Sequence, residues 1–118
     1  MLFEVAPEAT ARRLADALLA AEWGDPGAWR YLDDDALYRL RTDADVIATI
    51  VPWALLRLSI QLVGHPRASV RLDVIRLLAM VFREDPALVD GALARLGTDA
   101  SRGVQRAAEN MRSRLAGT

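Results

Sequence analysis

Residues 52–85 read PWALLRLSIQLVGHPRASVRLDVIRLLAMVFRED, and residues 86–118 read PALVDGALARLGTDASRGVQRAAENMRSRLAGT. Identical or similar residues recur in the two stretches 34 positions apart: Pro52 and Pro86, Leu62 and Leu96, Val70 and Val104, Leu77 and Met111. A fixed internal offset of this length is typical of a repeated helical unit. The sequence therefore predicts that one helix-pair unit is present twice in the C-terminal part of the chain.

Each unit is expected to start a helix at its proline, because the first helical position needs no N–H donor. Asp85 before Pro86 is a good N-cap, whereas Val51 before Pro52 is not. A polar break follows each first helix, at 64–69 and at 97–101. The second helices then carry apolar stripes of helical period: Val70, Val74, Leu77, Leu78 and Val81 in one, and Val104, Ala107, Ala108, Met111 and Leu115 in the other.

The N-terminal part, residues 1–51, is also expected to be helical. A helix is predicted from Pro7 to about Glu22, and the glycines and proline in 23–27 end it in a turn. A short helical turn at 28–32 and a helix capped by one of Asp33, Asp34 or Asp35 follow. We expect that helix to run unbroken to Val51; the alternative is a split at Thr42-Asp43.

These segments predict a single all-α domain, 1–118, of about six helices stacked as antiparallel pairs. Residues 1–51 would be divergent N-terminal helices, 52–85 a repeat unit, and 86–118 a C-terminal capping unit. The helix of the first unit that starts at Val70 is apolar nearly all round, so we expect it to be sandwiched. The last helix carries several arginines opposite its apolar stripe, and a terminal unit needs such a polar outer face.

Composition agrees with a soluble helical protein. About half of the residues are hydrophobic, all fifteen basic residues are arginine, and there is no cysteine, which removes disulfides, thiolate metal sites and cysteine nucleophiles. Residues 1–45 carry ten acids against five arginines, and residues 46–118 carry ten arginines against six acids. Such asymmetry can steer a charged partner or favour head-to-tail self-association, although it can equally reflect two solvated faces.

A membrane segment is not expected. Val46–Val63 is apolar enough to resemble one, but Arg57 at its centre would cost about 2.5–3.5 kcal/mol on insertion. Met1–Val5 lacks the basic region of a secretory signal. We therefore expect Val46–Val63 to be buried in a soluble protein of the cytoplasm.

The second helix of the first unit opens with Ser69-Val70-Arg71 after a proline-containing turn, and the turn of the second unit carries Asp99 ahead of Val104. This pattern, over roughly residues 52–116, resembles HEAT-type helical repeats, including the shorter bacterial forms. The chain departs from it twice, with His65 at the first unit's Asp position and Gln105 at the second unit's Arg position. The resemblance implies a short HEAT-like α-solenoid in which Arg71 reaches Asp99 one unit along; the alternative is that Arg71 points to solvent.

Catalytic and ligand-binding motifs are weak. His65 is the only histidine, has neither a second histidine nor a cysteine as co-ligand, and precedes a proline, so we expect an exposed loop side chain. The Asp33-Asp34-Asp35 run lacks the spacing of a calcium loop, and helix capping explains it. The net charge of −1 argues against a nucleic-acid binder despite the arginines at 102–114. The sequence thus predicts no catalytic, metal or cofactor site, and no enzyme.

Three aromatic residues, Trp23, Trp29 and Tyr31, surround the turn of the acidic half. Tryptophan and tyrosine dominate protein interfaces, so these are candidate partner contacts; the alternative is a hydrophobic lid on the open end of the stack. Trp53 is expected to be structural.

The function predicted by analogy of fold is a non-catalytic protein-interaction module or adaptor that binds another protein or itself, as a dimer or obligate complex. The alternative is an immunity- or antitoxin-type protein that blocks a toxin enzyme.

Overall fold

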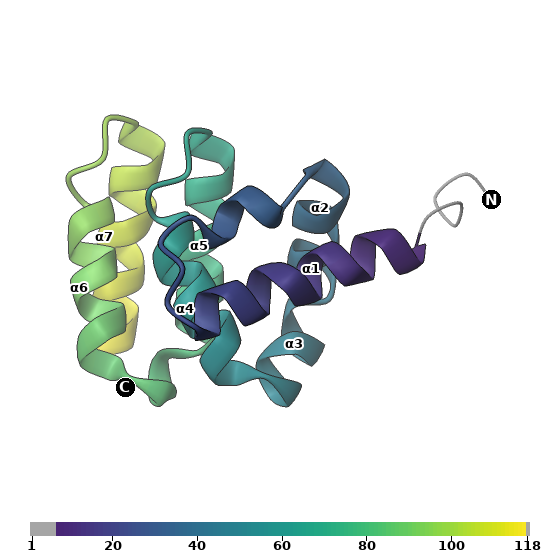
Figure 1. Cartoon of the computed structure of the whole chain (residues 1–118). Helices are drawn as coiled ribbons and strands as arrows, with labels where there is room; N and C mark the ends of the chain where they lie inside the picture. The colour runs from purple at the N-terminus through teal and green to yellow at the C-terminus, as the bar shows by residue number, and fades with distance from the viewer. Residues whose placement is uncertain (1–6, 118) are drawn as a thin grey trace.

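Helices separated by short turns make up the chain between Pro7 and Gly117, the part that this computed structural model describes (Figure 1). The α-helices are α1 (Pro7–Glu22), α2 (Asp34–Thr42), α3 (Ala44–Ile50), α4 (Pro52–Leu62), α5 (Ala68–Met80), α6 (Pro86–Leu96) and α7 (Arg102–Ala116). Two short 3-10 helices, η2 (Ala28–Tyr31) and η3 (Phe82–Glu84), complete them. Residues 7–117 contain no strand, which confirms the all-α prediction.

Residues 7–117 contain seven α-helices rather than about six, because the segment expected to run unbroken to Val51 is divided at Asp43, as in the alternative of a split at Thr42-Asp43. Asp43 has φ −106° and ψ 17°, outside the helical region, and it both ends α2 and precedes α3. Its carboxylate reaches back to Arg39, 3.1 Å away, instead of capping α3. Leu40 and Ala44, on either side of the break, are both buried, so the bend turns both short helices toward the core.

The offset of 34 positions reappears in the element boundaries. Pro52 and Pro86 open α4 and α6, which are both 11 residues long, and α5 and α7 begin at residues 68 and 102. Asp85 caps α6 by accepting the Leu88 N–H at 3.1 Å, as predicted, while Val51 makes no side-chain cap. The prolines and the cap therefore set the helix starts that the sequence indicated.

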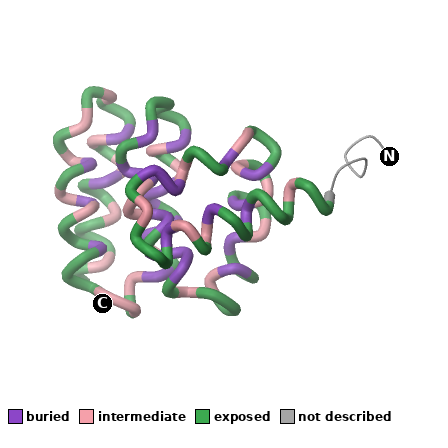
Figure 2. Tube along the Cα trace, viewed as in Figure 1, coloured by how far each residue is buried: buried purple, intermediate pink, exposed green. Residues whose placement is uncertain are grey.

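The core centres on α4, which packs against α1 and α5; α5 in turn packs against α7, and α6 against α7 and α5. Figure 2 shows buried residues along the facing sides of these helices. The largest fully buried side chains include Leu55, Leu58, Val74, Leu78 and Leu93. The Cα radius of gyration is 13.8 Å, close to the value of about 13.5 Å for a compact domain of this length.

α5, the helix from Val70 that was expected to be sandwiched, packs against α4 and against α7. α5 has neighbours on two sides, but Leu72 is 45 % exposed and Met80 is 37 % exposed. Ile75, which lies between them in the sequence, is only 4 % exposed. A helix held between two neighbours still leaves its outer side open to solvent.

The N-terminal helix is tied to the central helix by Arg57. Its Nε donates to the Ala21 carbonyl at 3.0 Å, at the C-terminal end of α1, where carbonyls lack helical partners. Gly24, with φ +86°, follows, and the Asp25 N–H returns to the Ala20 carbonyl at 2.8 Å. This left-handed glycine ends α1 as a Schellman-type cap requires.

The apolar stretch Val46–Val63 forms two helices. Val51, with φ −133° and ψ 58°, separates α3 from α4, because a residue before proline disfavours helical geometry. Within residues 7–117, no helix is long and apolar enough to cross a membrane. Met1–Val5, considered above for a signal sequence, lies outside the described residues.

Two ends of the molecule can be distinguished in Figure 1. The turns that precede α5 and α7 lie together at one end, at the top of the view. The α3 helix, the connection from α5 to α6 and the C-terminus lie toward the opposite end. A shielded ion pair lies at the first end, and exposed apolar side chains lie at the second.

Candidate functional site

At the end with the α4–α5 and α6–α7 turns, Arg71 and Asp99 form a two-point ion pair. Arg71 Nε lies 2.8 Å from Asp99 Oδ1, and Arg71 Nη2 lies 3.1 Å from Asp99 Oδ2. Their side chains are only 14 % and 11 % exposed. The hydrogen bond from Arg71 holds the pKa of Asp99 below its usual value, against the opposing effect of burial. The structure thus brings together the two residues that the resemblance paired.

Equivalent hydrogen bonds also occur inside each of the two turns. The Arg67 N–H donates to His65 Nδ1 at 3.1 Å, and 34 positions along, the Ser101 N–H donates to Asp99 Oδ2 at 2.8 Å. Arg71 Nη1 donates to the His65 carbonyl at 2.8 Å, and Gln105 Nε2 likewise donates to the Asp99 carbonyl. His65 and Gln105, the two residues that depart from the HEAT pattern, therefore still make the hydrogen bonds of their turns. They differ from the Asp and Arg of the pattern in carrying no charge there.

His65 is buried rather than exposed in its loop, so that prediction is wrong. Its ring is in T-shaped contact with Trp29, with ring centroids 5.2 Å apart. Burial, and then the nearby charges of Arg67 and Arg71, lower the pKa of His65. The imidazole is thus held neutral as a hydrogen-bond acceptor, and its edge-to-face contact secures the turn against η2.

The three predicted partner contacts differ in how far they are exposed. Trp29 is half-buried against the core and His65. Trp23 is 85 % exposed in the turn after α1, and Tyr31 is 47 % exposed at the end of η2. Trp23 and Tyr31 are therefore available to a partner, whereas the main contacts of Trp29 are within the fold.

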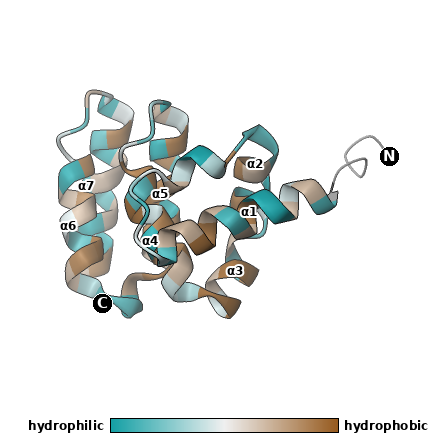
Figure 3. Ribbon diagram, in the orientation of Figure 1, coloured by the Kyte–Doolittle hydropathy of each residue, from teal (hydrophilic) through white to brown (hydrophobic). Residues whose placement is uncertain are grey.

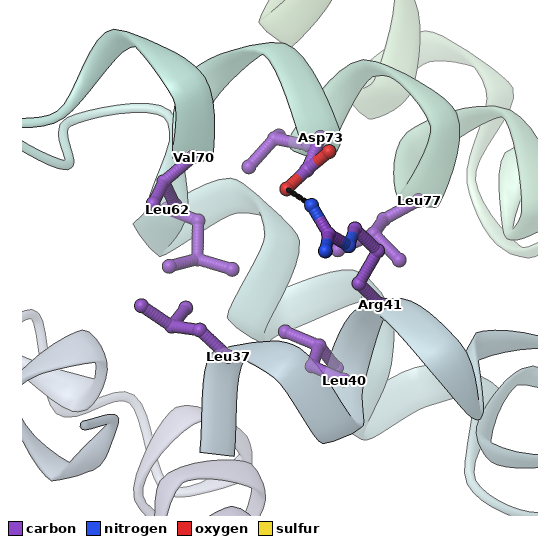
Figure 4. Close-up of a pocket in the computed structure, with 8 residues that line it drawn as sticks. Leu37, Leu40, Arg41, Leu62, Val70, Asp73 and Leu77 are labelled. Atoms are coloured by element: carbon purple, nitrogen blue, oxygen red, sulfur yellow. Dashed lines mark ion pairs between the residues drawn. The ribbon is translucent and has the colours of Figure 1, made fainter. Parts of the chain in front are cut away.

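A small pocket lies between α2 and α5 (Figure 4). Its floor is apolar, formed by leucines and valines that include Leu37, Leu40 and Leu62, and Arg41 reaches across it to Asp73, 3.9 Å away. The space inside is about 10 Å³, which holds no more than one water molecule. The pocket is a packing seam between two helices and is too small for a ligand.

Potential metal ligands in the described part of the chain are not clustered. No group of three His, Cys, Asp or Glu side chains there could hold a metal ion. Asp33 caps α2 by accepting the Ala36 N–H at 2.9 Å and pairs with Arg13, and Asp34 pairs with Arg67 at 2.8 Å. Asp33 thus caps α2, as the sequence suggested, and Asp33 and Asp34 also form ion pairs.

The end of the molecule that carries α3 has a different character. Four large apolar side chains within eight positions point to solvent there: Val46 (58 % exposed), Ile50 (70 %), Val51 (37 %) and Trp53 (52 %). We call these four residues the apolar ridge. Figure 3 shows hydrophobic residues along α3 and at the start of α4, on the edge of the molecule. Trp53, expected to be structural, is thus half open to solvent.

The ridge borders an open groove of about 420 Å³. Its apolar lining comes from the α3–α4 junction, the end of α5, η3 and the end of α7, and includes Ala48, Pro52, Ala79, Met80, Phe82 and Leu115. Arg83 and Glu84 also line it. The volume falls in the range of about 300–1,000 Å³ typical of binding pockets, and the lining is mixed, with charged residues beside apolar ones.

The sequence prediction missed the ridge, although a signal was present. Ala44 and Ile47 of α3 are buried, and Val46 and Ile50 lie on the other side of the same helix. An apolar residue opposite a buried stripe has no partner within the fold. Singly exposed apolar residues are ordinary, but a cluster of large ones marks an interaction surface.

Comparison of the chain with protein-family models, with curated proteins and with solved structures finds no match.

Proposed function

We propose that this protein is a non-catalytic binding module that contacts another protein chain through the apolar ridge and its neighbouring groove. The observation that carries the proposal is the exposure of Val46, Ile50, Val51 and Trp53 within eight residues. Leaving such side chains in water is unfavourable by roughly 25 cal/mol for each Å² of apolar surface. A partner that covers them recovers that free energy.

The scaffold we propose is a short HEAT-type stack, with α4–α5 and α6–α7 as successive antiparallel units. The 34-residue offset in helix starts and the matching hydrogen bonds at His65 and Asp99 support it. On α7, Glu109 and Arg112 occupy the positions of Ile75 and Leu78 on α5, so the outer side of the last helix is charged. That side suits the capped end of a stack, which leaves the ridge as the best-suited contact surface.

The partner contact can be tested by placing a photo-crosslinking amino acid at position 50 in the source cell. The matched control places it at position 38, because Tyr38 is also strongly exposed but lies on α2, away from the ridge. We expect a discrete covalent adduct with a protein from position 50 and a much weaker one from position 38. If position 50 yields no adduct, or no more than position 38, the proposed function is wrong.

A further inference from the structure

A hollow of about 300 Å³ lies along the N-terminal half of α7, and its lining comes from this helix alone. The lining residues are Arg102, Gly103, Arg106, Ala107 and Asn110. Arg102, Arg106 and Asn110 follow one another at intervals of four residues, so they lie along one side of the helix. We call these three residues the ladder. In Figure 1 this part of α7 lies at the end of the molecule opposite the ridge.

The two arginines of the ladder differ from most arginines of this fold. All fifteen arginines lie within residues 7–117, and seven of them form ion pairs: Arg13, Arg30, Arg39, Arg41, Arg67, Arg71 and Arg112. Arg102 and Arg106 are exposed and form no ion pair with any other described residue. Asp99 lies three positions before Arg102, but Arg71 binds both of its carboxylate oxygens. The two guanidinium groups are therefore free to bind an anion from outside the fold.

The residues of the hollow weaken the start of α7 rather than strengthen it. Like charges four residues apart destabilise a helix, and Arg102 is the first residue of α7, where the helix dipole disfavours a cation. Glycine is a poor helix former, yet a Cβ on Gly103 would have Ser101 Oγ as its nearest neighbour at 3.7 Å, an ordinary contact. The fold could thus accept a side chain at Gly103. Three locally unfavourable residues therefore line one hollow, which points to a bound group that uses both the charges and the space.

Carboxylates at alternate positions of an extended peptide match the ladder. Four residues of α-helix rise about 6 Å, and alternate residues of an extended chain lie about 6.5 Å apart on one side. Arginine binds carboxylates through two parallel hydrogen bonds, so Arg102 and Arg106 suit two acids separated by one residue. Asn110 can both donate and accept a hydrogen bond, as a neutral peptide group requires. Gly103 and Ala107 carry no long side chain, which leaves room for the peptide backbone.

The same residues suit an acidic protein segment better than a nucleic acid. The chain has a net charge of −1, and residues 1–45 carry ten acids against five arginines, so a long polyanion is repelled by much of the molecule. The hollow has no aromatic side chain in its lining on which a base could stack. The third residue of the ladder, Asn110, is neutral, whereas a phosphate chain carries a charge at every nucleotide.

We infer that this side of α7 binds an extended acidic segment of a partner protein, with carboxylates at alternate positions paired to Arg102 and Arg106. The contact goes beyond the proposed function, because it lies at the opposite end of the molecule from the ridge and depends on charge. The ladder and the ridge share no residue, so both surfaces can be occupied at once.

Nuclear magnetic resonance titration of the isotope-labelled full chain tests the inference. The first probe is a short serine-rich peptide that carries Glu-Ser-Glu, and its control has the same composition with the two glutamates adjacent. In an extended peptide, adjacent side chains point to opposite sides. We expect saturable shifts of the backbone amides at 102–110 with the Glu-Ser-Glu peptide, and several-fold weaker binding of the control peptide.

Three variants separate a built site from general attraction. Arg106→Gln should weaken binding of the Glu-Ser-Glu peptide about tenfold or more, because a charge-assisted pair is lost. The matched control Arg12→Gln removes the same charge from an exposed arginine of α1 that forms no ion pair with any described residue, and should bind as the wild type does. Gly103→Leu keeps every charge but fills the hollow, and should also weaken binding. Circular dichroism shows whether each variant remains folded; all three positions are exposed.

Several results would overturn the inference. These are a Glu-Ser-Glu peptide that does not bind or binds no better than its control, and Arg106→Gln or Gly103→Leu variants that bind as Arg12→Gln does. A single-stranded oligonucleotide is the last probe. If it shifts the same amides at lower concentration than the peptide, the hollow takes phosphates and the acidic segment is wrong. None of these results changes the outcome of crosslinking at position 50, so the proposed function is tested separately.

Discussion

Arg71 binds both carboxylate oxygens of Asp99, at 2.8 and 3.1 Å, and so joins the start of α5 to the turn before α7. The positive end of the helix dipole makes arginine unfavourable at a helix start, and the bidentate pair offsets this. Arg71 also donates to the carbonyls of His65 and Pro66 at 2.8 and 2.9 Å. One guanidinium therefore fixes two successive turns relative to each other.

Replacing either member of this pair should destabilise the fold. We expect Arg71→Ala and Asp99→Ala each to lower the free energy of unfolding by about 1–3 kcal/mol, since charge-assisted bonds are lost and a shielded charge is left unpaired. The double variant should cost less than the sum of the two, because the pair can be lost only once. Urea denaturation of the four proteins measures this, and strict additivity would show that the two residues act independently.

Stability should also fall as the solution becomes mildly acidic, because of His65. Its pKa is lowered in the folded protein by burial and by Arg67 and Arg71, so the unfolded chain takes up a proton first. The free energy of unfolding should be constant above about pH 7 and decrease as pH falls below about 6.5, levelling off once the folded protein also becomes protonated.

His65 is the only histidine, so a slope in this range can be assigned to it. His65→Asn keeps an acceptor for the Arg67 N–H without a titrating group. This variant should be less stable at pH 7 because it loses the contact with Trp29, yet show no slope between about pH 7 and 5.5. Urea denaturation across this pH range is the measurement, and an unchanged slope in the variant would refute the assignment.

Leucines on the two sides of α5 should respond differently to truncation. Leu78 is fully buried, so Leu78→Ala should cost about 2–5 kcal/mol through lost burial and a residual cavity. Leu72 is 45 % exposed, and we expect Leu72→Ala to cost less than about 1 kcal/mol. Thermal or urea unfolding of both variants tests this. Equal losses would mean that α5 is enclosed on all sides.

The start of α6 depends on its cap. Asp85→Ala removes the acceptor of the Leu88 N–H and should cost about 0.5–2 kcal/mol, whereas Asp85→Asn, which keeps an acceptor, should stay close to the wild type. Urea denaturation of the two variants decides the matter. If asparagine were as damaging as alanine, the contribution of Asp85 would not be that of a cap.

Local chemistry explains why much of the fold could be predicted from the sequence. Pro52 and Pro86 open α4 and α6, and Gly24 ends α1, because each of these residues restricts the backbone by itself. The helix boundaries of the first unit, shifted by 34 positions, then predict those of the second unit. The pair of Arg71 and Asp99 was reachable only through the resemblance, since 28 positions separate them along the chain.

Features decided by packing could not be predicted in the same way. The break at Asp43 leaves the apolar spacing of α2 and α3 intact, so periodicity could not reveal it. His65 precedes a proline in a polar turn, and only the approach of Trp29 buries it. Val46 and Ile50 were expected to be buried because Val46–Val63 is predominantly apolar, and hydropathy alone does not tell a core surface from a contact surface.

The central claim is that the ridge is covered by protein in the functional state. Carbene footprinting of the chain in its source cell and as dilute purified protein tests this most directly, because it reports the solvent exposure of individual side chains. We predict that labelling at Val46, Ile50 and Trp53 falls several-fold in the cell while labelling at Tyr38 stays constant. Equal labelling of the ridge in both conditions would contradict the account.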